Sequence, residues 1–138
     1  TTRLNFNNYV AIYKCRNQYG GGCALIIKKN IIFDEIPISS NSDIIGVKLK
    51  LMDNKDLIVF SHYNPPTEEL SLDYLRNTIQ NENSIIITCG DFNAKNVLLG
   101  NTVSNKSGDI LLDFILDNNF LILNNDDPTY SENYRNYT

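Results

Sequence analysis

The chain has 138 residues, of which 42% are hydrophobic and 20% are charged, and its formal net charge is −4 at pH 7. This length predicts one small domain with a buried core. The sequence contains no apolar run of membrane-spanning length and no signal-peptide pattern at its N-terminus. Modules that bind DNA on their own usually carry a basic excess, so the acidic balance argues against tight nucleic-acid binding by this chain alone.

The cysteines indicate the redox compartment of the protein, and the methionine content indicates that the chain is a segment. Cys15, Cys23 and Cys89 form no CxxC pair, which favours reduced thiols in an intracellular protein over a disulfide scaffold. The sequence begins with Thr1, and its single methionine is Met52. The chain is therefore expected to be a segment of a longer protein.

The first half of the chain is predicted to be a meander of strands at residues 9–14, 23–28, 31–38, 44–51 and 57–63. The run Gly20-Gly21-Gly22 leads into a strand, whereas a phosphate-binding loop runs from a strand into a helix, so the glycines indicate close backbone packing or a bulge. Residues 53–56 are predicted to form a turn, and Asn64-Pro65-Pro66 ends the last strand. Such a meander favours an antiparallel or mixed sheet.

The second half is predicted to alternate helices with strands. A helix is expected to begin at Thr67 as N-cap, and its apolar face consists of Leu70, Tyr74, Leu75 and Ile79. A strand over residues 85–89 follows. A second helix, capped by Ser107 and ending at residues 118–119, leads to a last strand over residues 120–123. This order fits a layered α/β sandwich of the α+β class.

Basic side chains are concentrated in the first half, and the sequence leaves two explanations open. They form a local basic patch, or they lie on ordinary solvated strand faces, which is the commoner case. The residues concerned are Lys14, Arg16, Lys28, Lys29, Lys48 and Lys50.

The strongest candidate for a functional site is the stretch IIITCGDFNA at residues 85–94. An apolar run of strand length ends there in a carboxylate and, two residues later, a carboxamide. Because a strand end is rigid, Asp91 and Asn93 are suited to orienting a water or an oxyanion. An Asp/Asn turn after a strand is an equally frequent alternative, and the local sequence leaves both open.

Three segments in order resemble motifs of the endonuclease/exonuclease/phosphatase superfamily: GGGCALIIK at residues 20–28, SHYNPP at 61–66 and, most specific, GDFNA at 90–94. The pattern that follows is similar to the endonuclease domains of LINE-like and jockey-like non-LTR retrotransposons. The resemblance runs from about Leu4 to the end of the chain. The residues of the trailing pattern are Gly108, Leu112, Asp113, Phe114, Asn119, Asn124, Pro128 and Thr129.

The resemblance implies a partial four-layered α/β sandwich of the DNase I-like type, with residues 1–138 as one truncated domain. Family members hydrolyse phosphate esters with Mg²⁺ or Mn²⁺. By the same resemblance, Asp91 matches the carboxylate that activates or orients the attacking water, Asn93 matches the amide that helps to place the phosphate, and Tyr63 matches an active-site tyrosine. The implied partners are DNA and a fused reverse transcriptase, with no membrane, and the implied place of action is the nucleus.

The sequence departs from the family pattern at both ends. The metal-binding Glu is expected at the position of Thr1 or upstream of it, and a hydroxyl is a poor substitute because Mg²⁺ prefers anionic oxygen ligands. The later acidic ligand and the Ser-Asp-His motif lie beyond Thr138. The 138-residue chain is therefore expected to lack Mg²⁺-dependent hydrolysis, while the intact domain nicks DNA.

The sequence also leaves two alternative functions open. One alternative is that the chain belongs to a phosphatase or lipid phosphodiesterase of the same superfamily, and the other is that it is a non-catalytic remnant. His62, the only histidine, is expected on the strand face opposite Tyr63 and is assigned a structural role. Asp109 and Asp113 are expected to be a first-turn residue and a surface residue of the second helix, not metal ligands.

Overall fold

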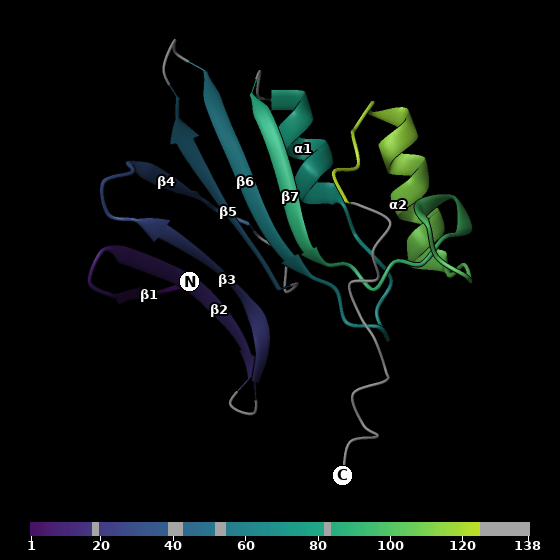
Figure 1. Cartoon of the computed structure of the whole chain (residues 1–138), viewed down its shortest axis with the longest axis horizontal. Coiled ribbons are helices and arrows are strands. Elements are labelled where there is room, and N and C mark those ends of the chain that lie inside the picture. The colour runs from purple at the N-terminus through teal and green to yellow at the C-terminus, as the bar shows by residue number, and fades with distance from the viewer. Residues whose placement is uncertain (18–19, 39–42, 52–54, 82–83, 125–138) are drawn as a thin grey trace.

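The computed structural model of the chain describes residues 1–17, 20–38, 43–51, 55–81 and 84–124. Within these ranges, strands fill the first half, and the second half contains two α-helices with one further strand between them (Figure 1). The elements are β1 (Thr2–Asn5), β2 (Tyr9–Asn17), β3 (Gly20–Lys28), β4 (Phe33–Ile36), β5 (Asp43–Lys50), β6 (Asp56–Tyr63), α1 (Asp73–Asn81), β7 (Ile85–Asp91), the 3₁₀ turn η2 (Val97–Leu99) and α2 (Lys106–Asp117).

The strands form two sheets, one with the order β1-β2-β3 and the other with the order β4-β5-β6-β7. Neighbouring strands are antiparallel except β6 and β7, which are parallel and are connected through α1. The predicted meander and the mixed sheet are therefore confirmed. The short strand β1 is an addition to the predicted elements.

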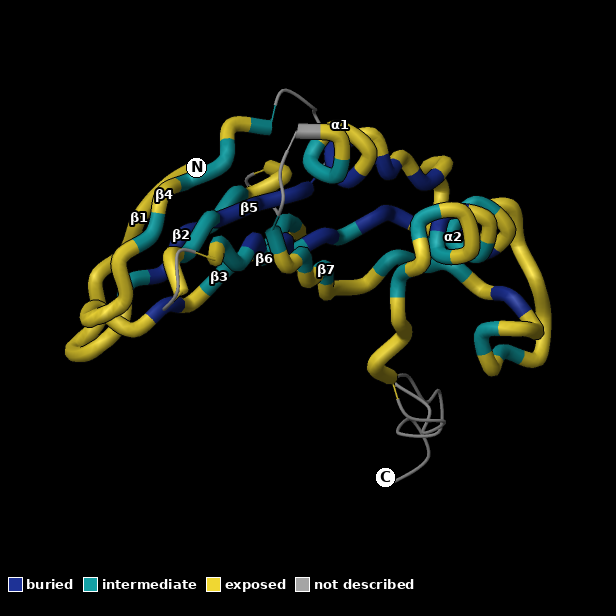
Figure 2. The backbone as a smooth tube through the Cα atoms, turned by 90° about the horizontal axis from the view of Figure 1, so that it is seen from above, coloured by how far each residue is buried: buried dark blue, intermediate teal, exposed yellow. Residues whose placement is uncertain are grey.

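The two sheets pack face to face, and α1 covers the other face of the four-stranded sheet (Figure 2). Residues from β5 illustrate how alternation builds both cores. Ile45 packs with Ile12 and Ile27 between the sheets, whereas Ile44 packs with Phe60 under α1. The described residues thus form three layers of the expected sandwich.

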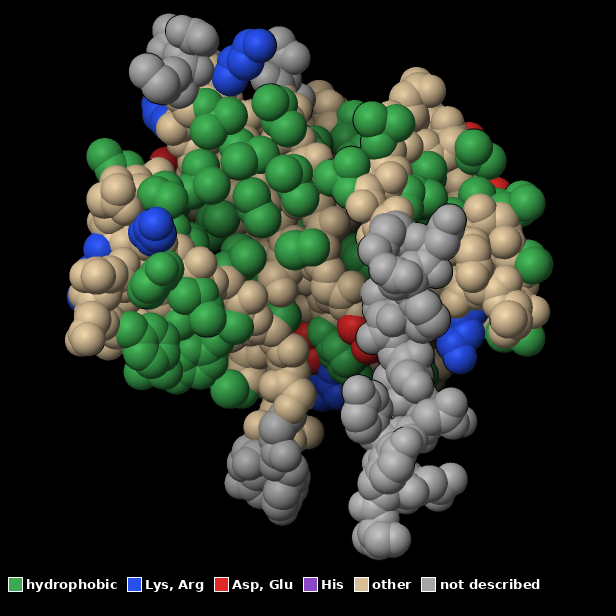
Figure 3. Space-filling view, viewed as in Figure 1, with side chains coloured by type: hydrophobic (Ala, Val, Ile, Leu, Met, Phe, Trp, Pro, Cys, Tyr) green, Lys and Arg blue, Asp and Glu red, His purple; other side chains and the backbone are tan. Residues whose placement is uncertain are grey.

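Strand β7 extends beyond the cover of the three-stranded sheet, which packs mainly on β5 and β6. As a result, the side chains of Ile85 and Ile87 are 50% and 39% exposed. Figure 3 shows hydrophobic side chains gathered over this sheet in the view of Figure 1. One apolar face of the molecule is therefore open to solvent along β7.

The glycine run opens β3, as the sequence predicts, and serves close backbone packing. Gly22 has φ of 109°, and a Cβ at this position would lie 1.9 Å from the carbonyl oxygen of Lys14 on β2. No side chain fits there. A strand start, and not a phosphate-binding loop, explains the glycines.

The predicted first helix begins later than the sequence suggests, at Asp73 instead of after Thr67. The buried side chain of Asn64 donates to the carbonyl oxygen of Glu68 at 3.2 Å, and the backbone N–H of Glu68 donates to that of Pro65 at 3.0 Å. These bonds hold a turn where the helix was expected. Leu70 therefore packs into the core from a loop rather than from the helix.

Two further predictions about the second half are wrong. The N-cap of α2 is Asn105, not Ser107, which is buried in the first turn. The strand predicted over residues 120–123 does not form, because Asn119 adopts φ of 54° and the N–H of Phe120 donates to the carbonyl oxygen of Ile115 at 3.0 Å. The ring of Phe120 then packs on Phe114 of α2, so this segment follows the helix and not the sheet.

Other predicted boundaries are close. The strand predicted over residues 31–38 is shorter, at Phe33–Ile36, and α2 ends at Asp117 with Asn118 as its C-cap, close to the expected end at residues 118–119. Asp109 lies in the first turn of α2, and Asp113 is exposed on the same helix. Residues 53 and 54 of the turn predicted at residues 53–56, together with Pro128 and Thr129, lie outside the described residues, and Asp56 is already the first residue of β6.

Candidate active site

Two of the three predicted catalytic residues meet at one edge of the four-stranded sheet. Strands β6 and β7 run parallel and end together, and their register places Tyr63 beside Asp91. Neighbouring side chains in such a pair project from the same face of the sheet. The backbone continues this pairing, since the N–H of Asn64 donates to the carbonyl oxygen of Asp91 at 2.8 Å.

Asn93 belongs to the same edge and combines the two explanations that the sequence left open. Its backbone N–H donates to the Asp91 carboxylate at 3.1 Å, which closes an Asx-type turn, and its φ of 46° lies in the left-handed region. Its side-chain Nδ2 donates to the carbonyl oxygen of Asn64 at 2.8 Å. The turn therefore fixes the carboxamide beside Tyr63 and Asp91.

Gly90 explains why the motif begins with glycine. Its φ is 142°, and a Cβ there would lie 1.8 Å from the carbonyl oxygen of His62. Only glycine allows β7 to approach β6 this closely. The close approach sets the position of Asp91, the next residue.

Asn105, a residue without a predicted role in the site, fastens α2 to the loop after β7 that carries Asn93 and Lys95, here called the site loop. Its Oδ1 accepts from the backbone N–H of Gly108 at 2.8 Å, as an N-cap does, and also from that of Lys95 at 2.9 Å. Its Nδ2 donates to the carbonyl oxygen of Asn93 at 2.9 Å. One carboxamide thus ties the helix start to the loop that carries Asn93.

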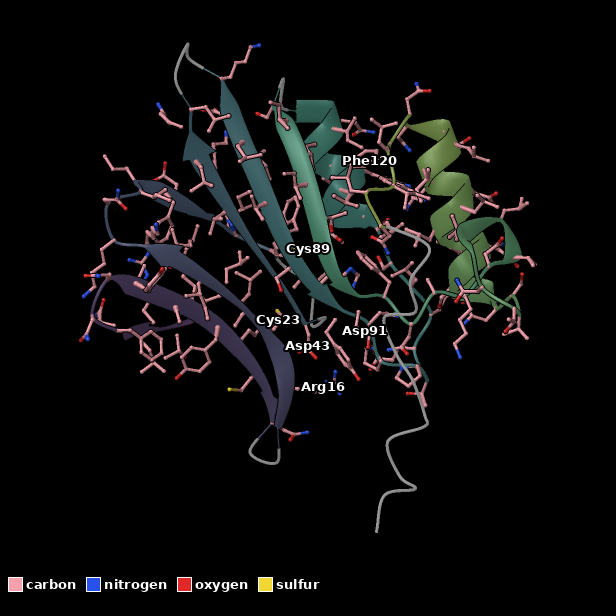
Figure 4. The ribbon with its side chains drawn as sticks, in the orientation of Figure 1. Arg16, Cys23, Asp43, Cys89, Asp91 and Phe120 are labelled. Atoms are coloured by element: carbon pink, nitrogen blue, oxygen red, sulfur yellow. The ribbon has the colours of Figure 1, made fainter. Side chains whose placement is uncertain are left out.

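Arg16 and Asp43 lie at the same edge and were not predicted as site residues (Figure 4). Asp43 begins β5 and pairs in register with Tyr63. Its carboxylate is 3% exposed and accepts from Arg16 Nε at 2.7 Å and from Arg16 Nη2 at 2.6 Å. The Arg16 guanidinium carbon also lies 4.7 Å from the centre of the Tyr63 ring.

The electrostatics of this group follow from the ion pair. The hydrogen bond to Asp43 raises the pKa of Arg16 above its usual value, with a further contribution from Tyr63. Nearby, burial together with the negative charge of Asp43 raises the pKa of Cys23 to about 11. This thiol is therefore protonated and unreactive at neutral pH.

The basic residues of the first half do not form one patch. Arg16 is paired with Asp43 at the site edge, and Lys48 lies 3.6 Å from Asp56. Lys28 and Lys29 are exposed at the other end of β3. Most of these side chains therefore lie on solvated strand faces, which is the commoner of the two explanations that the sequence left open.

Thr1, at the expected position of the metal-binding Glu, contacts β4, the edge strand of the four-stranded sheet that lies opposite β7. Its Oγ1 donates to Glu35 on β4 at 2.5 Å, and Arg3 pairs with the same carboxylate at 2.6 Å. The Thr1 hydroxyl and Arg3 lower the pKa of Glu35. Among the described residues, no three His, Cys, Asp or Glu side chains gather in a group that could hold a metal ion.

His62 lies on the opposite face of β6 from Tyr63, as predicted. It is 2% exposed, and its Nδ1 lies 3.0 Å from the hydroxyl of Tyr74 on α1. Burial lowers its pKa to about 4. The expected structural role of this histidine therefore agrees with its surroundings.

The fold defined by these sheets is the DNase I-like α/β sandwich expected from the sequence. A solved structure described as the endonuclease domain of TRAS1, a telomere-specific non-LTR retrotransposon, superimposes with a TM-score of 0.73 at 21% sequence identity. The match covers 91% of this chain and 60% of that domain, so the chain spans less than two thirds of its length. A comparison with curated proteins returned no match.

A comparison of the sequence with protein-family models identifies the family of the chain. The family model described as endonuclease-reverse transcriptase matches residues 57–138, which is more than half of the chain. The chain belongs to the endonuclease-reverse transcriptase family. The resemblance stated from the motifs is thereby confirmed, and the matched region includes Tyr63, Asp91 and Asn93. In the described part of the chain, no helix is long and apolar enough to cross a membrane.

Proposed function

We propose that the chain is part of a DNA-nicking endonuclease domain that hydrolyses phosphodiesters with Mg²⁺ or Mn²⁺. The observation that carries the proposal is the meeting of Tyr63, Asp91 and Asn93 at one sheet edge. The description of the family and that of the TRAS1 domain support a nuclease over another phosphoesterase.

The side chains suit the chemistry of in-line attack on a phosphodiester. Asp91 is an anionic acceptor that orients the attacking water through a hydrogen bond. The second N–H of the Asn93 carboxamide and the Tyr63 hydroxyl are donors for the phosphate oxygens, where negative charge develops. As the bond from the water oxygen to phosphorus forms, the water gives up one proton toward the Asp91 carboxylate, the opposite phosphorus–oxygen bond breaks, and the leaving oxygen takes a proton from solvent.

The described residues do not supply a complete metal site. Asp91 is the only acidic residue of the three site residues, and Thr1 offers a hydroxyl where a carboxylate is expected. No step of the reaction is therefore assigned to a bound cation. The proposal includes the inactivity of the 138-residue chain on its own.

The proposal also extends to partners and location. The family description supports a link to a reverse transcriptase in the parent polypeptide. Such an enzyme acts on chromosomal DNA, so the place of action that we propose is the nucleus.

Plasmid nicking tests the proposal. The purified 138-residue chain is expected to leave supercoiled plasmid intact in the presence of Mg²⁺. The same chain expressed with the coding sequence that flanks it is expected to nick the plasmid, and Asp91→Ala is expected to reduce the rate by roughly 10²-fold or more. Asp113→Ala, an exposed change on α2, is the matched control and leaves the rate unchanged.

Three outcomes contradict parts of the proposal. Robust nicking by the 138-residue chain that Asp91→Ala abolishes contradicts its inactivity. Full activity of the extended Asp91→Ala protein contradicts the role of Asp91. Hydrolysis of phosphomonoesters or phospholipids without nicking assigns the chain to another branch of the superfamily, and no hydrolysis of any of these substrates identifies a non-catalytic remnant.

A further inference from the structure

The guanidinium of Arg16 lies against residues of three different elements at the site edge. Asp43 of β5 accepts two of its hydrogen bonds, and the Tyr63 ring of β6 lies 4.7 Å from its central carbon. At the start of β3, Gly21 has φ of 81°, and a Cβ there would lie 3.4 Å from the guanidinium. Arg16 thus reaches from the three-stranded sheet to the four-stranded sheet.

The Arg16–Asp43 ion pair restrains the Tyr63 ring more than an unpaired arginine would. The Asp43 carboxylate is 3% exposed, so its position is set by the core of the molecule. An arginine held through Nε and Nη2 to one carboxylate has a fixed plane, because the guanidinium is rigid. A cation within about 6 Å of an aromatic ring centre is attracted to the ring face.

We propose that the Arg16–Asp43 ion pair is a positioning device for Tyr63, which holds the ring so that its hydroxyl faces the scissile phosphodiester beside Asp91. This inference rests on the proposed function for its catalytic consequence only. The positioning itself is a property of the chain as it stands. Arg16 is here a positioning residue that acts through Tyr63.

The alternative use of an arginine at this edge is direct contact with a DNA phosphate. Only 35% of the Arg16 side chain is exposed, and two of its donors are already occupied by Asp43. The observations therefore favour positioning over phosphate binding. The two roles differ in a measurable way, because only one of them acts through Tyr63.

Fluorine NMR on the 138-residue chain tests the positioning directly. The chain has eight tyrosines, so labelling with 3-fluorotyrosine gives one signal for each, and Tyr63→Phe identifies the signal of residue 63. Arg16→Met keeps the length of the side chain and removes the cation. It is expected to shift the residue 63 signal, while the unchanged signals elsewhere report an intact fold.

Two further variants sharpen this measurement. Arg16→Lys keeps the charge without the planar fork and is expected not to restore the native signal. Arg76→Met is the matched control, because Arg76 also lies over a ring, 5.5 Å from that of Phe114, and pairs with Asp73. It is expected to leave the residue 63 signal in place. An unshifted signal in folded Arg16→Met, or full restoration by Arg16→Lys, overturns the proposal.

The catalytic consequence is tested in the nicking-competent extended protein. Arg16→Met is expected to reduce kcat by roughly tenfold to a hundredfold with little change in KM, since a displaced catalytic group costs rate. In the Tyr63→Phe background the same change is expected to have no further effect. A loss that adds to that of Tyr63→Phe, with a raised KM at high salt, identifies direct phosphate contact and overturns positioning.

The two experiments separate this inference from the proposed function. If no form of the protein nicks DNA, the proposed function fails, yet the fluorine signal still reports whether Arg16 holds Tyr63. If the extended protein nicks DNA and Arg16→Met leaves both kcat and the signal unchanged, only the positioning inference fails.

Discussion

His62 lies in a closed polar group beneath α1. Its Nδ1 lies 3.0 Å from the Tyr74 hydroxyl, which in turn lies 3.1 Å from the Thr88 hydroxyl, and the rings of Tyr74 and Phe92 meet the imidazole edge to face. Burial lowers the pKa of His62 and raises that of Tyr74. Both side chains are therefore neutral at pH 7 and contribute to packing instead of to chemistry.

The depressed pKa of His62 predicts acid destabilisation in a defined window. The unfolded chain binds a proton at this residue near pH 6.5, whereas the folded chain binds it near pH 4. The free energy of unfolding therefore falls as the pH is lowered from about 6.5 to 4, by on the order of 3 kcal/mol.

Urea unfolding of native protein and of His62→Phe at several pH values measures this effect. Carboxylates titrate in the same window in both proteins, so the difference between them isolates the histidine. The difference is expected to change by most of the predicted amount between pH 6.5 and 4. Parallel pH curves would contradict a neutral buried imidazole.

At the scale of single residues, part of the site could be predicted from the sequence. Alternation along β6 separated His62 from Tyr63, and the motif around Asp91 identified the strand end. Arg16 and Asp43 could not be predicted, because they meet only when the hairpin of β2 and β3 packs across the other sheet. In sequence, Arg16 has the same local pattern as a solvated surface cation.

At the scale of elements, α2 shows why helix boundaries were predicted less well than helix existence. Asn105 and Ser107 are both good N-cap residues, and local preference does not choose between them. The choice falls on Asn105 because its carboxamide also bonds to Asn93 and Lys95 of the site loop, which a serine hydroxyl two residues later cannot reach. A tertiary contact thus fixed a local boundary.

Gly108 provides a sharp test of how tightly α2 meets the site loop. Helix propensity alone predicts that Gly→Ala stabilises a helix by about 1 kcal/mol. A Cβ at Gly108, however, would lie 1.8 Å from the carbonyl oxygen of Lys95, so the helix start must move away from the loop. Gly108→Ala is expected to destabilise the chain by about 3 kcal/mol, as severe overpacking does.

Gly100→Ala serves as the control for this change. Gly100 has φ of 84°, and a Cβ added there would meet nothing within 4 Å, so only the backbone cost of about 1 kcal/mol applies. Thermal or urea denaturation of both variants gives the comparison. A stable Gly108→Ala protein would contradict the close contact between the start of α2 and Lys95.

At the scale of the whole molecule, charge limits what this chain does with DNA. With a net charge of −4, it has no overall attraction to phosphates. Binding to duplex DNA near physiological salt is expected to be micromolar or weaker, at about the level of non-specific binding.

Fluorescence anisotropy with a labelled duplex at two salt concentrations checks this expectation. If the site edge contacts phosphates, Lys95→Ala beside Asn93 reduces the slope of log affinity against log salt by about 1. Lys29→Ala, an exposed change near the other end of β3, is the matched control and leaves the slope unchanged. Nanomolar binding by the 138-residue chain would contradict the electrostatic argument.

The overall arrangement was predictable in its strands and less so in its sheets. Apolar patterns identified six of the seven strands in the described residues, but nothing local assigns β1 to β3 to one sheet and β4 to β7 to another. The strand expected over residues 120–123 has the right composition, yet its first residue is bonded to the end of α2. Composition sets the tendency of a segment to extend, and its neighbours decide whether it pairs.

The parallel pairing of β6 with β7 also sets the order in which the site is assembled. The antiparallel partners Lys50 and Asp56 are close in sequence, so the β5–β6 hairpin closes a short loop. Tyr63 and Asp91 meet only after the whole α1 crossover has closed, and longer loops are entropically costlier and slower to form. The site edge is therefore expected to be among the last parts of the chain to fold. In a partly folded chain the strands are formed, but Tyr63 and Asp91 do not yet lie side by side.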